Sequence, residues 1–401
     1  MKGYQFEDTQ GTFHLKKAEN ISYLYFPIAG EAGLKSSLTP NLGGDAKIDQ
    51  NTFLLEPVSA ENLVNNRNSR NFWCNVKGIG SWSLTGNAAE ALSKKFTEMQ
   101  DDSEVTAGFM WQKTTRESKK YQLRGEILSF IPVEKNVEVM LVTITNTGRM
   151  AQTVTPTAAI PLYGRSADNI RDHRHVTSLL HRIETTDTGV LVTPTLSFDE
   201  RGHQVNHMTY YCVGWSGNGE KPVDFYPTAE DFVGEGGNFE RPYAIVKKAE
   251  GVKAGTRIEG LEAVGGLHFS EVTLEPEEEC SYLIFTGITE DIQEIRNLSK
   301  TYTTREMVLE ELEKTKAYWQ EKVNVAYHTG DSDFNQFMHW VSFQPILRRI
   351  YGCSFLPHHD YGKGGRGWRD LWQDCLALLI MNPDGVRQML LDNFAGVRVD
   401  G

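Results

Sequence analysis

Residues 136–148 read NVEVMLVTITNTG, and this stretch has the residue types of a long buried β-strand. β-branched residues favour strands, and Asn and Gly at the end indicate a turn. Alternate residues of a strand face opposite sides. One face would carry Val137, Val139, Leu141 and Thr143, and the other Glu138, Met140, Val142 and Ile144. Neither face is strongly polar, which is typical of a strand inside a β-sandwich.

Similar short segments rich in Val, Ile, Thr, Tyr and Phe recur on both sides of this strand. Most are separated by Gly, Asn, Asp or Pro clusters, which predict turns. They include EVTAGFMWQKT, YQLRGEILSFIPV, GVLVTPTLSF, MTYYCVGWSG, HFSEVTLEP and CSYLIFTGI. We therefore predict a large antiparallel β-sandwich over residues 1–290.

The hydrophobic period changes to that of helices after about residue 290. Thr303 to Glu306 resembles a capping box before a helix, so we expect a helical linker over 291–330. A second helical stretch follows, with Phe334, Phe337, Met338 and Val341 on one stripe. After WRDLWQDCLALLIM, Asn382 would be the N-cap of another helix, with Pro383 at its first position and Gly396 at its end. We assign 331–401 to the start of a helical domain.

Composition excludes several classes of protein. The chain has 401 residues and a formal net charge of −12, which argues against nucleic-acid binding. The N-terminus lacks the apolar core of a signal peptide, and no run of about 18 apolar residues predicts a membrane span. The five cysteines are scattered, as in reduced cytoplasmic proteins. His358 and His359 are adjacent, which does not suit joint ligation of one ion, so we expect no metal.

The segment 362–381, GKGGRGWRDLWQDCLALLIM, carries the residues with the clearest chemistry. On a helix, Arg369 and Gln373 form one column and Asp370 and Asp374 the next. Two stacked carboxylates repel each other, and their burial is costly unless they are paired. Apolar neighbours, from Leu371 to Ile380, suggest that most of the helix is buried. Two explanations stay open: a structural polar network, or a polar cavity that binds a ligand such as a sugar.

Cations cluster before this helix. Lys363 and Arg366 alternate with glycines, and Arg348 and Arg349 precede them by one short segment. Such a cluster could cradle an anion such as phosphate. The alternative is a flexible surface loop with solvated cations. The spacing is not that of a P-loop.

At this segment the chain resembles glycoside hydrolase family 94, the cellobiose, chitobiose and laminaribiose phosphorylases once called glycosyltransferase family 36. GKGGRGWRDLWQD is similar to the Gly-rich, RDxxQD-bearing start of their catalytic (α/α)6 barrel. Residues 22–59 and 155–183 are similar to their N-terminal β-sandwich. The resemblance covers essentially the whole chain. It implies a supersandwich, a helical linker and the start of a barrel.

The resemblance also implies roles for individual residues. Arg369 and Asp370 fall on the pair that holds the non-reducing glucosyl unit, and Lys363 or Arg366 on a cation that binds this sugar and phosphate. The supporting residues would be Gln373, Asp374 and Trp368. The general acid of the family is an Asp further downstream, beyond Gly401. We therefore expect these 401 residues to be an N-terminal part that is inactive by itself.

The implied reaction is inverting phosphorolysis of a β-1,3-, β-1,2- or β-1,4-glucoside to α-glucose 1-phosphate, with phosphate as co-substrate and no cofactor. A cytoplasmic homodimer that binds oligosaccharide, but neither nucleic acid nor membrane, is expected. The stretch 171–175, RDHRH, would either contact the partner subunit or form a loop held by local ion pairs. Two alternatives remain, an inverting (α/α)6-barrel hydrolase and a non-catalytic carbohydrate-binding protein.

Overall fold

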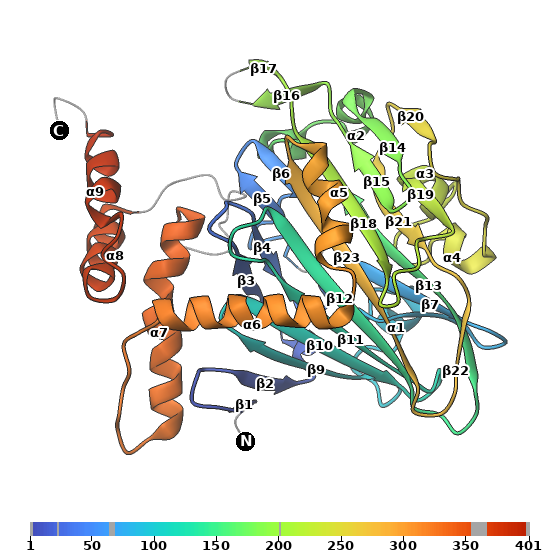
Figure 1. The fold of residues 1–401 in the computed structure, drawn as a ribbon, viewed down its shortest axis with the longest axis horizontal. Coiled ribbons are helices and arrows are strands. Elements are labelled where there is room, and N and C mark those ends of the chain that lie inside the picture. The colour runs from blue at the N-terminus through green and yellow to red at the C-terminus, as the bar shows by residue number, and fades with distance from the viewer. Residues whose placement is uncertain (1–2, 22–23, 64–68, 200–201, 354–366, 398–401) are drawn as a thin grey trace.

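The computed structural model describes residues 3–21, 24–63, 69–199, 202–353 and 367–397, and it shows stacked antiparallel sheets followed by helices (Figure 1). The larger sheet has the order β1 (Tyr4–Phe6), β2 (Phe13–Lys16), β9 (Asp102–Gly108), β10 (Trp111–Ser118), β11 (Leu123–Phe130), β12 (Val137–Asn146), β23 (Glu279–Thr289), β18 (Thr209–Ser216), β15 (Gly189–Val192), β14 (Arg182–Thr185) and β20 (Arg257–Glu259). The predicted sandwich is confirmed.

Two smaller sheets pack on this one, and a hairpin projects at one end (Figure 1). The first contains β19 (Asp224–Thr228), β21 (Ala263–His268), β13 (Gln152–Leu162), β7 (Asn71–Val76) and β8 (Gly80–Ser83), with β22 (Val272–Leu274) paired to β13. The second contains β3 (Phe26–Ala29), β4 (Lys35–Leu38), β5 (Ala46–Asp49) and β6 (Thr52–Leu55). The hairpin is β16 (Leu196–Asp199) with β17 (Gly202–Val205).

Helices follow the last strand. The long ones are α5 (Ile292–Thr301), α6 (Arg305–Lys322), α7 (Ser332–Tyr351), α8 (Trp368–Met381) and α9 (Val386–Phe394). Short ones lie between strands: α1 (Ala89–Ser93), α2 (Arg174–Thr177), α3 (Ala229–Val233) and α4 (Tyr243–Lys247), with 3-10 turns at Ala18–Asn20, Ala167–Arg171 and Ser178–Leu180. In the part of the chain that the structure describes, no helix has the length and hydrophobicity of a bilayer span.

Strand β12 is buried along its whole length, as its sequence predicts. One face, with Met140, Val142 and Ile144, belongs to the core between the sheets. The other face, with Val137, Val139 and Leu141, packs with side chains of α5 and α6. The helix α6 accordingly lies across the larger sheet (Figure 1). The two helices therefore form a third layer over the larger sheet, in which β12 is the sixth of eleven strands.

A charged residue lies on the inner face of β12. Glu138 is 1% exposed and forms an ion pair with Arg70, which is also 1% exposed. Ser36 Oγ donates to Glu138 Oε2 at 2.5 Å, and Arg70 donates to the backbone oxygens of Leu42, Gly44 and Asp45. These bonds connect β12 with the β3–β6 sheet. Once one of these two charges is buried, the other must also be present. A buried charge without a partner would have neither water nor an opposite charge to stabilise it.

The structure decides which side of α7 is buried and corrects the expected start of α9. The stripe of Phe334, Phe337 and Val341 is the exposed side of α7, because Phe343 and Ile346 are on the side packed against the sandwich. Asn382 does not cap α9. It ends α8, and α9 begins at Val386 after Gly385, whose positive φ of 76° makes the turn between the helices.

Substitution of Arg70 tests the buried ion pair. Arg70→Met leaves Glu138 buried without its cation, so the free energy of unfolding should fall by about 3–5 kcal/mol. Chemical denaturation monitored by circular dichroism measures this. The control is Arg257→Met, which removes an exposed pair with Glu184 and should change stability by about 1 kcal/mol or less. Equal effects of both variants would contradict the assigned role.

Candidate functional site

The helices α6 to α9 share one hydrophobic core with the sandwich. Ala29, Phe109 and Met110 of the sandwich pack with the helical residues Trp319, Val323, Phe343, Ile346, Leu347, Leu371, Cys375, Leu378 and Val386. Trp340 Nε1 of α7 also donates to Gly11 O at 2.7 Å. The sandwich therefore fixes α7, and α7 in turn supports α8.

The first turn of α8 presents the polar residues that the sequence singled out. The side chain of Arg369 is 84% exposed and that of Asp370 is 25% exposed, and Arg369 Nη2 lies 3.3 Å from Asp370 Oδ1. Gln373 is also exposed, whereas Asp374 is 1% exposed. The column of Asp370 and Asp374 thus faces inward, and the column of Arg369 and Gln373 faces outward.

Asp374 is held by Arg348 of α7. Arg348 Nε donates to both carboxylate oxygens, at 3.0 and 2.9 Å, and Nη2 donates to Oδ1 at 2.5 Å. These hydrogen bonds raise the pKa of Arg348, and the negative charges of Asp374 and Asp370 raise it further. Burial of the guanidinium group acts in the opposite direction. Asp374 shares the buried face of α8 with Leu371 and Leu378, and that spacing was the available signal that it would be buried.

The two arginines near the end of α7 do not form the open anion cluster that the sequence suggested. Arg348 binds Asp374, and Arg349 binds Glu31 at 2.6 and 3.2 Å. Each guanidinium group already has a carboxylate partner, whose negative charge would oppose an incoming anion. Lys363, Arg366 and the adjacent histidines 358–359 lie outside the described residues.

Aromatic side chains lie beside the polar turn. Trp368 and Trp372 are 6.4 Å apart between ring centroids, and both contact Phe394 of α9. They are 48% and 38% exposed. Sugar rings commonly pack their C–H faces on such exposed indoles. The expectation that most of α8 is buried was wrong, because Leu376, Leu379 and Ile380 are also exposed.

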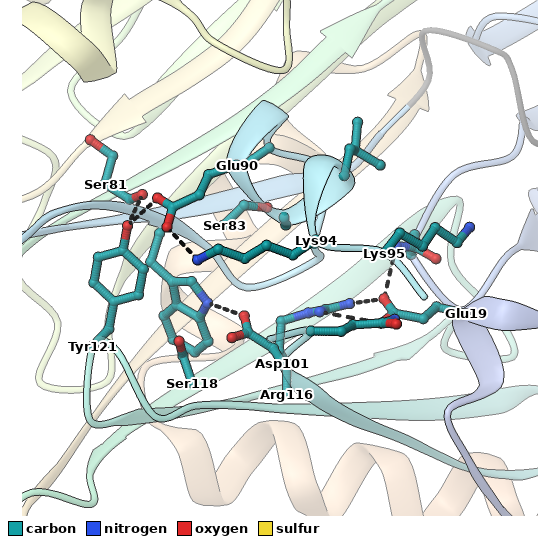
Figure 2. Close-up of a pocket in the computed structure, with 17 residues that line it drawn as sticks. Glu19, Ser81, Ser83, Glu90, Lys94, Lys95, Asp101, Arg116, Ser118 and Tyr121 are labelled. Atoms are coloured by element: carbon teal, nitrogen blue, oxygen red, sulfur yellow. Dashed lines mark hydrogen bonds and ion pairs between the residues drawn. The ribbon is translucent and has the colours of Figure 1, made fainter. Parts of the chain in front are cut away.

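A polar pocket lies in the sandwich between α1 and the strands β8 and β10 (Figure 2). Its residues bind one another: Trp82 Nε1 donates to Asp101 at 2.9 Å, Tyr121 OH donates to Glu90 at 2.8 Å, and Arg116 pairs with Glu19. Its volume of about 30 Å³ suits one water molecule rather than a sugar ring. Trp82 is 3% exposed, so it offers no stacking face. The pocket is therefore a structural network rather than a sugar-binding site.

The basic stretch 171–175 forms local ion pairs. Arg174 pairs with Glu56 and lies 3.8 Å from Glu262, which in turn binds Arg165 at 2.6 Å. His181, at the end of this excursion, is fully buried, with Nδ1 at 3.2 Å from Leu261 O. Burial, with the nearby Arg165 charge, lowers the pKa of His181 to about 3. The imidazole is therefore neutral in the folded protein at neutral pH.

His181 should make the sandwich sensitive to acid. In the unfolded chain it binds a proton as the pH falls through its ordinary value of 6.5, whereas the folded protein takes up that proton only near pH 3. The contribution of the buried, neutral His181 to the free energy of unfolding is therefore fully present above pH 6.5 and is lost as the pH falls below that value. Between pH 6.5 and about pH 5 the free energy of unfolding should fall by about 1.5 kcal/mol more than in His181→Gln. Urea titrations at both pH values measure this, and parallel losses in the two proteins would refute it.

Comparison with known proteins gives a family match over residues 57–305, to the Glycosyl hydrolase 94, supersandwich domain. The chain is also 27% identical over 203 residues to the cyclic beta-(1,2)-glucan synthase NdvB of Rhizobium meliloti (strain 1021), covering 47% of this chain and 6% of that protein.

Two solved structures match most of the length of this chain. A putative kojibiose phosphorylase from human microbiome gives a TM-score of 0.46 at 9% identity, over 86% of this chain and 42% of that one. A bacterial glucoamylase complexed with acarbose gives a TM-score of 0.39 at 9% identity, over 84% of this chain and 41% of that one. The chain spans less than half the length of each of these relatives.

The family match covers more than half of the chain and includes β12 and the sheet formed by β19, β21, β13, β7 and β8. It confirms the resemblance that the sequence motifs indicate. The chain belongs to glycosyl hydrolase family 94, a family of carbohydrate-active enzymes, and residues 57–305 carry its supersandwich domain.

Proposed function

We propose that the protein containing this chain catalyses inverting phosphorolysis of a β-linked gluco-disaccharide or oligosaccharide to α-glucose 1-phosphate. The observation that supports this most is the first turn of α8, where an exposed Arg369 lies beside Asp370 and next to exposed indoles. Family membership adds to it. In this proposal residues 331–401 are the first helices of an (α/α)6 barrel whose wall continues in other residues.

Arg369 and Asp370 would hold the hydroxyls of the non-reducing glucosyl unit. Charged groups make the strongest hydrogen bonds to hydroxyls, and a mixed pair offers both donors and acceptors. Trp368 and Trp372 would border the sugar, and Gln373 would extend the polar edge. Asp374, on the buried side of α8, would act indirectly, through its hydrogen bonds with Arg348.

In the reaction, a phosphate oxygen bonds to the anomeric carbon while the glycosidic C–O bond breaks on the opposite face. The leaving oxygen takes a proton from a general acid. We propose no residue of this chain for that role. Phosphate replaces the base-activated water of an inverting hydrolase. The phosphate ion must approach the carboxylates of the site, so cations are needed to offset the electrostatic repulsion. We propose Lys363 or Arg366 for this role.

This scheme requires no cofactor or metal. We also propose that the protein is a cytoplasmic homodimer. The name of the relative NdvB contains a β-(1,2)-glucan, so sophorose belongs among the first substrates to test, with laminaribiose and cellobiose. A hydrolase and a non-catalytic sugar-binding protein are the two alternatives.

Phosphate dependence separates these three functions. The protein made from the complete reading frame should release α-glucose 1-phosphate from at least one of the three disaccharides, and only when phosphate is present. Coupled assays of glucose 1-phosphate and of free glucose, with and without phosphate, measure this. Equal glucose release in phosphate-free buffer would show hydrolysis, and binding without any product would show a sugar-binding protein.

Substitution of Asp370 tests the site itself. Asp370→Asn removes the charge that strengthens hydrogen bonds to sugar hydroxyls but keeps the shape, so kcat/KM should fall by about 100-fold or more. Circular dichroism should show an unchanged fold. The matched control is Asp102→Asn on the sandwich surface, where the side chain is 65% exposed. Normal kinetics in Asp370→Asn would remove this residue from the site.

A further inference from the structure

The helix α8 has two inward-facing carboxylates, Asp370 and Asp374, one helical turn apart. Carboxylates at this spacing repel each other along a helix. Asp374 is almost completely buried, so its charge needs a partner inside the protein. Arg348 is that partner, through three hydrogen bonds from Nε and Nη2.

The same guanidinium group also interacts with Asp370. The hydrogen bonding of Asp374 comes first among the causes that raise the pKa of Arg348, and the attraction of Asp370 contributes as well. Asp370 is three-quarters covered, whereas Arg369 on its other side is exposed. Of the two cations that act on Asp370, Arg348 is the one that is held by a buried carboxylate.

Residues next to Arg348 are anchored on the sandwich. Arg349 binds Glu31, and Lys35 Nζ donates to Ile350 O at 3.1 Å. Tyr351 OH donates to Ile28 O at 3.2 Å and to Ser36 O at 2.5 Å. Four consecutive residues of α7 thus bind outside their own helix, one to α8 and three to the β3–β4 hairpin. The last turn of α7 is held on both sides.

We propose that Arg348 is a positioning residue, which offsets the repulsion between Asp370 and Asp374 and fixes the direction in which α8 presents Asp370 to a glucoside. This inference rests on the sugar-binding role proposed for Asp370. It replaces the direct phosphate contact suggested by sequence. The planar fork of arginine suits the role, because it holds one carboxylate through two nitrogens while its charge also attracts the other.

A purely stabilising role for Arg348 makes a different prediction, and a double variant separates the two. Arg348→Met alone leaves Asp374 buried and unpaired and should lower the melting temperature. Adding Asp374→Leu replaces the pair by apolar side chains, which restores stability in many buried pairs. A stabilising role requires that ligand affinity recovers with stability. A positioning role requires that affinity stays low.

The experiment measures the Kd of α-glucose 1-phosphate by calorimetry in the protein from the complete reading frame. The variant Arg348→Met with Asp374→Leu should have a melting temperature near that of the wild type and bind about tenfold more weakly or worse. Arg348→Lys keeps the charge but not the fork, and should bind several-fold more weakly while remaining folded. Arg305→Met with Glu279→Leu, which replaces a remote ion pair, is the control and should bind normally.

Either folded Arg348 variant with wild-type affinity would overturn the positioning role. If the double variant does not fold, the ligand affinity of Arg348→Lys alone tests the positioning role. Failure of the proposed function gives a different result: the wild type does not bind the ligand, or Asp370→Asn binds as tightly as the wild type. If Asp370→Asn weakens binding and neither Arg348 variant does, only the positioning role is wrong.

Discussion

The strand β12 has no solvent face, and this constraint organises the rest of the molecule. Its inner face requires a second sheet, and its outer face requires a cover, which α5 and α6 provide. A strand buried on both sides leaves no room for an unpaired charge, so Glu138 needs Arg70. That pair, with Ser36, also connects the β3–β6 sheet to the centre.

The connection from the centre to the candidate site passes through the β3–β4 hairpin and the last turn of α7. Ser36 binds Glu138 through its hydroxyl and accepts a bond from Tyr351 through its backbone oxygen. Three residues before Tyr351, Arg348 binds α8. Hydrogen bonds, together with the backbones of α7 and α8, thus connect the core of the supersandwich to the polar turn with Arg369 and Asp370. This continuity explains how a β-domain supports a site that lies on a helix.

Alternation and turn signals were enough to predict the sandwich and the burial of both faces of β12, because each strand's pattern is local. The helices were predicted at nearly correct positions for the same reason. Which face of α7 is buried could not be predicted, since Phe337 and Phe343 are equally apolar and only the packed partner decides between them. The extent of exposure on α8 also depends on which other elements cover it.

The residue types of the candidate site were visible in the sequence, but their pairing was not. Arg348 and Asp374 are on different helices, separated in sequence by the Gly-rich stretch, and nothing local indicates that they meet. The sequence therefore suggested an open cationic cluster, whereas the structure shows Arg348 and Arg349 each bound to a carboxylate. The exposed Arg369 beside Asp370 is the part of the motif that remains open to a ligand.

Hydrogen–deuterium exchange tests the central claim that the first turn of α8 is the sugar-binding element held by the sandwich. The protein from the complete reading frame would be compared with and without α-glucose 1-phosphate. The account predicts slower exchange in peptides that cover residues 368–374 and the end of α7, with the pocket between α1 and β8 unchanged. Protection confined to the sandwich, with unchanged exchange in α8, would contradict it.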